Sequence, residues 1–159
     1  PGRELDCCGV YRLAADGRLT LVCRTMTRPN GLAFSPDEQT LYVAQSDPRD
    51  PVVRAFTVRG DGALDEGRVF FDAASLAKDR RGLPDGLKVD ARGNLFATGP
   101  GGVLVIGPDG THLGTLLTGQ ATANCGFGED GSTLFITADS LLCRIRLATR
   151  GPGRPTAER

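Results

Sequence analysis

Three residues with oxygen-bearing side chains, Asn30, Asp85 and Asn124, stand at corresponding points of the sequence. Each opens a short apolar run, which is followed by a polar turn and by a second apolar run. One carboxylate and two amides supply the ligands that hard cations such as calcium prefer, whereas thiolates and imidazoles suit zinc or copper. A carboxylate in such a set could also take a proton from water.

The elements that must position these residues are β-hairpins. Residues 83–98 alternate between apolar and polar positions, pass through an Asp- and Gly-containing turn and return as a second apolar run, the pattern of two half-buried strands. The unit recurs ~40–55 residues apart, which is typical of a radial array of small sheets. Since a radial array places equivalent positions on a ring, we expect Asn30, Asp85 and Asn124 to converge at one end of a central channel.

Further apolar runs, separated by Gly, Pro and Asp-Gly turns, predict about 13 strands and no long helix. The expected fold class is all-β, and four-stranded blades would make these strands about three blades of a β-propeller. We expect a partial β-propeller over residues 1–148 and a disordered C-terminal tail over residues 149–159, which are polar and rich in Gly and Pro. Residues 73–84, with one helical turn at 74–78, are either a lid over the channel mouth or an ordinary connection between blades.

The composition restricts the class of protein. The chain has 19 Lys+Arg and 19 Asp+Glu residues, and zero net charge argues against a nucleic-acid or membrane-surface partner. Five cysteines without a C-x-x-C motif indicate free thiols and a cytoplasmic location. The start lacks both an initiator Met and signal-peptide character, so we expect an upstream segment. Four Asp-Gly pairs in predicted hairpin turns are interpreted as structural: Asp16, Asp61, Asp109 and Asp130.

Three segments resemble the gluconolactonase and regucalcin (senescence marker protein) family. They are residues 28–46 (RPNGLAFSPDEQTLYVAQS), residues 83–110 (LPDGLKVDARGNLFATGPGGVLVIGPDG) and residues 123–137 (ANCGFGEDGSTLFIT). The resemblance runs over most of residues 8–148, with the motifs in the same order. It implies a six-bladed β-propeller that binds a divalent cation on the channel axis and hydrolyses sugar lactones. The expected cation is Ca²⁺, with Zn²⁺, Mg²⁺ or Mn²⁺ as alternatives.

The resemblance also implies roles for individual residues. Asn30 matches the Asn of the family's P-N-G motif, which is a metal ligand. Asp85 matches the Asp of its P-D-G motif, a metal ligand and the candidate catalytic acid/base. Asn124 falls in an N-C-x-F-G segment at the channel mouth, where it is either a substrate contact or a cap of the backbone. The family's E-G-P motif, whose Glu is the third protein ligand, is absent, so the chain corresponds to the C-terminal half of the family.

We therefore expect metal-dependent hydrolysis of a sugar lactone, a small-molecule substrate, with the cation polarising the carbonyl and Asp85 acting as ligand or general base. Three blades do not close a ring, so the missing N-terminal blades or a second copy are expected to complete it. One alternative is a non-catalytic fragment that binds or handles calcium and is inactive alone because the Glu ligand is missing. Another is a truncated gene product that does not act alone.

Overall fold

Thirteen β-strands in four antiparallel sheets dominate the structure, a computed structural model that describes residue 2 and residues 4–153. The first sheet contains β1 (Val10–Leu13) and β2 (Leu19–Cys23). The second contains β3 (Pro29–Phe34), β4 (Thr40–Gln45), β5 (Val52–Thr57) and β6 (Arg68–Asp72). The third contains β7 (Leu87–Val89), β8 (Leu95–Gly99), β9 (Gly102–Ile106) and β10 (His112–Leu117). The fourth contains β11 (Thr122–Gly128), β12 (Thr133–Ala138) and β13 (Leu141–Arg146).

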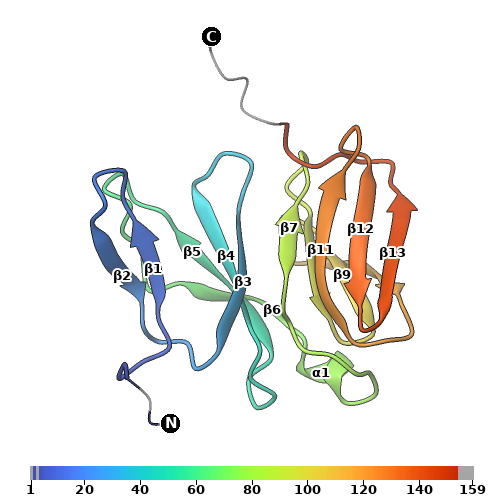
Figure 1. Cartoon of the computed structure of the whole chain (residues 1–159), viewed down its shortest axis with the longest axis horizontal. Helices are drawn as coiled ribbons and strands as arrows, with labels where there is room; N and C mark the ends of the chain where they lie inside the picture. The colour runs from blue at the N-terminus through green and yellow to red at the C-terminus, as the bar shows by residue number, and fades with distance from the viewer. Residues whose placement is uncertain (1, 3, 154–159) are drawn as a thin grey trace.

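Every sheet is built from strands that follow one another directly in the chain, each antiparallel to the next. Figure 1 shows the sheets succeeding one another from β1 and β2 on one side of the molecule to β12 and β13 on the other. The first strands of the last three sheets, or the segments just before them, are joined to each other by backbone hydrogen bonds. This is the arrangement of propeller blades with their first strands at the axis, so the prediction of an all-β partial β-propeller is confirmed.

Apolar side chains fill the space between adjacent sheets. Tyr42 and Val53 of the second sheet pack with Leu87 and Leu104 of the third in one cluster. Phe96 of the third sheet lies in a second cluster with side chains of the fourth. Because a blade in the middle of the array is covered on both faces, all five residues of β8 are buried. Each fully buried Leu or Val contributes about 1.5–3 kcal/mol relative to exposure.

The turns follow the chemistry expected from their Asp-Gly pairs. In each predicted structural turn the Asp carboxylate accepts a hydrogen bond from the backbone N–H two residues later: Asp16, Asp61, Asp109 and Asp130. The Gly that follows each of these residues has positive φ, which a residue without Cβ adopts at low cost. The interpretation of these four carboxylates as structural is confirmed.

The strand-free stretch of residues 73–84 contains one short helix, α1 (Ala74–Ala77), as the sequence predicted. Its C-terminal part is held on the turn between β8 and β9, since Gly101 N–H donates to Arg81 O over 2.8 Å. No helix in the described part of the chain is long and apolar enough to cross a membrane.

The predicted tail starts with residues that the fold holds in place. Thr149 Oγ1 donates to Asp90 Oδ2 over 2.8 Å, and Gly151 N–H donates to Gly131 O over 2.9 Å. Residues 154–159, the remainder of that predicted tail, lie outside the described residues.

Candidate functional site

The segments that carry Asn30, Asp85 and Asn124 lie side by side where the last three sheets meet. Gly31 N–H donates to Asp85 O over 3.2 Å, and Gly86 N–H donates to Ala123 O over 2.9 Å. These bonds place the residue after Asn30 against Asp85, and the residue after Asp85 against the residue before Asn124. Three positions spread along the chain therefore occupy one end of the array of inner strands.

Glycine is required for this close approach. A Cβ on Gly31 would lie 2.2 Å from Asp85 O, and a Cβ on Gly86 would lie 2.2 Å from Asn124 Oδ1. Both distances are far below van der Waals contact, so a larger residue at either position would force neighbouring sheets apart. The Gly of the Asn-Gly and Asp-Gly pairs thus has a packing role in addition to its turn preference.

The three residues differ in how their own strand presents them. Asp85 precedes β7, whereas Asn30 lies within β3 and Asn124 within β11. In both strands the pairing register shifts at this point, between Pro29 and Leu32 and between Thr122 and Asn124. Such irregularities re-aim side chains and interrupt the regular ladder. From the sequence, we predicted that all three residues precede their strands. Composition alone does not distinguish a shift in strand pairing from the end of a strand.

The side chain of Asn30 is oriented by Ser46, a residue that the sequence analysis did not single out. Asn30 Nδ2 donates to Ser46 Oγ over 3.0 Å, and Ser46 Oγ donates to Pro84 O over 2.6 Å. Since the amide nitrogen is engaged, Asn30 Oδ1 is the atom left to accept a donor or bind a cation. The signal that could have identified Ser46 is its place directly after β4, at the end of the sheet where Asn30 lies.

The carboxylate of Asp85 is half-buried and, among the described residues, forms no hydrogen bond or salt bridge. Burial raises the pKa of Asp85 above its usual value, because removal from water disfavours the charged form. A carboxylate that is neither exposed nor paired is an unusual arrangement, since most buried polar groups have partners. This side chain offers four lone-pair sites to a cation or a proton donor.

Asn124 has partners for much of its polar surface. Its Oδ1 accepts the N–H of Cys125 over 2.9 Å, and its own backbone N–H donates to Thr137 Oγ1 over 3.1 Å. The adjoining Thr98 hydroxyl lies 3.0 Å from Gly86 O and 3.1 Å from Ala123 O. Asn124 therefore caps its own backbone locally, and its amide group lies beside Gly86.

The donor set suits an oxygen-preferring cation. The described residues contain no group of three or more His, Cys, Asp and Glu that could hold a metal, so a site here depends on Asp85 together with the amide oxygen of Asn30. One carboxylate and one neutral oxygen fit part of the six to eight oxygen ligands of calcium. The nearby thiol is unsuited to ligation, because burial raises the pKa of Cys125 to about 11.

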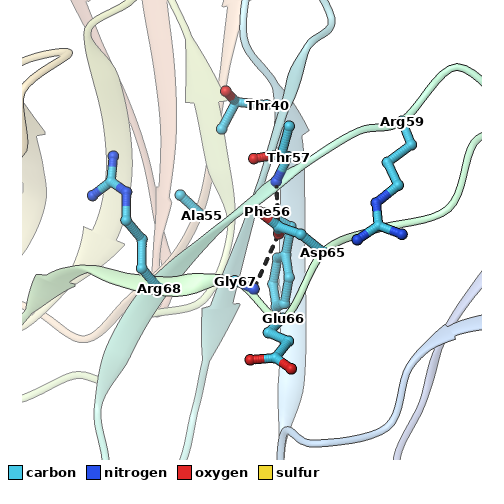
Figure 2. Close-up of a pocket in the computed structure, with 9 residues that line it drawn as sticks. All are labelled: Thr40, Ala55, Phe56, Thr57, Arg59, Asp65, Glu66, Gly67 and Arg68. Carbon is cyan, nitrogen blue, oxygen red and sulfur yellow. Dashed lines mark hydrogen bonds between the residues drawn. The ribbon is translucent and has the colours of Figure 1, made fainter.

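A separate hollow of about 470 Å³ lies on the outer part of the second sheet and is lined by residues of β5, β6 and the turn between them. Figure 2 shows Asp65 in this hollow, where its carboxylate accepts the N–H groups of Thr57 and Gly67. The Thr57 side chain, followed by the backbone N–H groups of Thr57 and Gly67, lowers the pKa of Asp65 through hydrogen bonds. None of Asn30, Asp85 and Asn124 lines the hollow. We interpret Asp65 as a residue that fixes the β5–β6 turn.

Comparisons with known proteins give a consistent result. A family model described as "SMP-30/Gluconolactonase/LRE-like region" matches residues 2–140. A gluconolactonase of Zymomonas mobilis is 43% identical over 154 residues, and the match covers 94% of this chain and 43% of that protein. A solved gluconolactonase structure from Xanthomonas campestris has a TM-score of 0.81 and 40% identity, covering 92% of this chain and 47% of that one.

A more distant structure has a similar fold. The calcium-binding protein regucalcin from Agrobacterium tumefaciens has a TM-score of 0.71 at 23% identity, and the match covers 92% of this chain and 54% of that chain. The chain therefore spans about half the length of the proteins that it matches.

Proposed function

Because the chain belongs to the SMP-30/gluconolactonase/LRE-like family, we propose that it provides part of the active site of a divalent-cation-dependent sugar-lactone hydrolase. The observation that carries this proposal is the half-buried Asp85 carboxylate, which has no partner among the described residues. Its segment is hydrogen-bonded to the segment of Asn30, whose amide nitrogen is already engaged. Similarity to gluconolactonases supports a lactone as the substrate. Similarity in fold to a calcium-binding protein supports Ca²⁺ as the cation, with Zn²⁺, Mg²⁺ and Mn²⁺ as alternatives.

Hydrolysis of a lactone, a cyclic ester, requires a polarised carbonyl, an activated water and stabilisation of the oxyanion. When bound, the cation supplies Lewis acidity toward the carbonyl oxygen and lowers the pKa of water. Asp85 would hold the cation as a ligand or accept the proton of the attacking water as a general base. Asn30 contributes a neutral oxygen, which retains the cation without reducing its charge. Asn124 is proposed to contact the substrate at the channel mouth.

We place this function in the cytoplasm. Cys7, Cys23, Cys125 and Cys143 carry free thiols, which is the state expected in a reducing compartment. A second candidate function is calcium binding without turnover. It is favoured because the described residues contain no group of three or more His, Cys, Asp and Glu that could hold a metal, so the site as proposed has one carboxylate, that of Asp85, to serve both as ligand and as base. The two functions differ in whether lactone hydrolysis accompanies cation binding.

The test compares the wild-type chain with its Asp85→Asn variant in two measurements. Hydrolysis of glucono-1,5-lactone is monitored through the release of protons, and Ca²⁺ binding is measured by calorimetry. We expect EDTA to abolish turnover in the wild-type chain and Asp85→Asn to reduce the rate by roughly 10²–10⁴-fold. Asp109→Asn is the matched control, because Asp109 lies in a hairpin turn away from the site. Normal turnover by Asp85→Asn would refute the role of Asp85, and Ca²⁺ binding without turnover would favour the second function.

A further inference from the structure

We infer that a hollow beside the start of β3, which we call the arginine hollow, is a binding site for an oxyanion such as a phosphate group. The hollow has a volume of about 430 Å³, within the range of roughly 300–1,000 Å³ that small-molecule sites occupy. Its walls come from the segment before β1, the connection from β2 to β3 and the loop from β4 to β5. It shares no lining residue with the hollow in Figure 2.

The charges around the arginine hollow favour an anion. Three arginines line it: Arg24, Arg28 and Arg49. Two acidic residues, Asp6 and Asp47, line it as well, so one positive charge is left unbalanced. Each guanidinium group presents five N–H donors in a planar fork that matches the oxygens of a carboxylate or a phosphate. Several such forks around one hollow therefore suit a ligand with more than one charged oxygen.

Two of the arginines are held in place by carboxylates of the chain. Arg24 Nη2 lies 3.0 Å from Asp6 Oδ2. Arg49 Nε and Nη2 each lie 3.5 Å from a carboxylate oxygen of Asp47. These ion pairs use one or two of the five donors, so both guanidinium groups retain N–H groups for a ligand. Because the side chains are already oriented, binding has to overcome less conformational entropy.

The Asp47 carboxylate supports the wall of the hollow. It is only 2% exposed. It accepts hydrogen bonds from Thr27 Oγ1 over 2.7 Å and from the Arg49 backbone N–H over 3.0 Å, in addition to those from the Arg49 side chain. With its oxygens engaged in this way, Asp47 fixes the position of Arg49 and is not available to attract a cation into the hollow.

Arg28 is the arginine left for a ligand. It is exposed, and its guanidinium group forms no hydrogen bond or ion pair with the residues that the structure describes. Arg28 stands two residues before Asn30, so the Cα atoms of these residues are at most about 7 Å apart. The arginine hollow therefore adjoins the candidate cation site on the side of the first sheet.

Two sources of oxyanion share this chemistry. One is free inorganic phosphate. The other is an anionic substituent of the sugar lactone, and this source rests on the proposed function. A substituent held by Arg28 would bring the attached sugar toward Asn30.

The test titrates inorganic phosphate into the chain at low salt, in EDTA and without lactone, and follows the backbone amides by nuclear magnetic resonance. We expect the amides of residues 24–28 and of Arg49 to shift, with a dissociation constant on the order of millimolar that rises as salt is added. Arg28→Gln should weaken binding by about tenfold, because a charge-assisted contact is lost. This result does not depend on lactone hydrolysis, so the two proposals fail separately.

Three further variants separate a specific site from an effect of net charge or folding. Arg59→Gln is the matched control, because it removes the same charge from an exposed residue outside the arginine hollow, and it should bind phosphate like the wild-type chain. Arg28→Lys retains the charge without the fork and should recover only part of the affinity. Asp6→Asn releases Arg24 and should strengthen binding by about two- to fivefold, an increase that a damaged fold would not produce.

A titration with 6-phosphogluconate identifies the source of the oxyanion. Tighter binding of 6-phosphogluconate than of phosphate would support a substituent of the sugar, and equal or weaker binding would support free phosphate; both results are consistent with an oxyanion site. The inference would be overturned if phosphate caused no shifts at residues 24–28 and Arg49, or if Arg28→Gln and Arg59→Gln had equal effects. Weaker binding by Asp6→Asn would also overturn it.

Discussion

At the scale of single residues, the burial of the Asp85 carboxylate lowers the stability of the folded chain when this group is ionised. Its carboxylate lacks a partner among the described residues, and burial raises its pKa. A raised pKa means that ionisation is less favourable in the folded state than in the unfolded chain. Above the folded pKa, therefore, the charged form destabilises the cation-free protein. A bound divalent cation would reverse this effect.

We expect Asp85→Asn to raise the melting temperature of the cation-free chain at pH 7 and to have little effect at pH 3, where Asp85 is protonated. The same variant should lose the Ca²⁺-dependent rise in melting temperature that we expect for the wild-type chain. Differential scanning calorimetry in EDTA and in Ca²⁺ measures both effects. Destabilisation of the cation-free chain by Asp85→Asn would show that the carboxylate has a stabilising partner.

Ser46 acts on the proposed site through Asn30 and the backbone before Asp85. Removing its hydroxyl in Ser46→Ala frees the Asn30 amide to rotate, and we expect Ca²⁺ affinity to fall by about tenfold, the lower end of typical losses for residues that orient ligands. Ser46→Thr, which retains the hydroxyl, should restore much of the affinity. Ser75→Ala in α1, where the side chain is exposed, serves as the control. Equal affinities of Ser46→Ala and the wild-type chain would contradict the positioning role.

At the scale of elements, Asp47 ties the start of β3 to the end of β4. Asp47 is 2% exposed, and it accepts hydrogen bonds from Arg49 N–H over 3.0 Å and from Thr27 Oγ1 over 2.7 Å. The Arg49 backbone N–H and the Thr27 hydroxyl, with a smaller contribution from the Arg49 side chain, lower the pKa of Asp47 to about 2. Because the folded pKa is depressed, the resulting stabilisation is present above the unfolded value and is lost as pH falls toward 2.

We therefore expect the wild-type chain to lose stability as the pH is lowered from 4 to 2, with part of the loss due to Asp47. Asp47→Asn should be less stable than the wild-type chain at pH 6 but should show a flatter profile below pH 4. Urea unfolding followed by circular dichroism at several pH values tests this prediction. Parallel profiles for the two proteins would be inconsistent with it.

The elements that the sequence predicted well are those with local causes. The hairpin that follows Asp85 was predictable because Asp90 accepts the N–H groups of Arg92 and Asn94, and because Gly93 has positive φ. The short helix and the strand number follow from similar local signals. Sequence reasoning did not identify the links from Ser46 to Pro84 O and from Thr98 to Ala123 O, since these acceptors belong to other hairpins and come close only when the sheets dock. Burial of Asp47, an acidic residue in a polar loop, was hidden for the same reason.

At the scale of the whole molecule, the proposed site depends on blades that approach one another at glycines, which have no side chain. Gly31 is the clearest example, since its missing Cβ leaves room for Asp85 O of the next blade. The proximity of the segments that carry Asn30, Asp85 and Asn124 thus results from the packing of sheets against one another. It depends on no single sheet.

We expect Gly31→Ala to destabilise the chain by about 1–3 kcal/mol, as overpacking of an interior contact does, and to weaken Ca²⁺ binding as well. Gly126→Ala is the matched control, because a Cβ there meets no atom within 4 Å. Chemical denaturation and Ca²⁺ titration of both variants give the two readouts. A Gly31→Ala chain that behaves like Gly126→Ala would argue against tight contact between the blades.

The pairing of each strand with the next strand in the chain also determines the order of events during folding. Contacts within a sheet join residues close in the chain, so each hairpin can form early and independently during folding. The meeting of Asn30 with Asp85 joins distant residues and has to wait until preformed sheets dock. The capacity to capture a cation would consequently arise at the last stage of folding, after most of the backbone has already reached its native pairing.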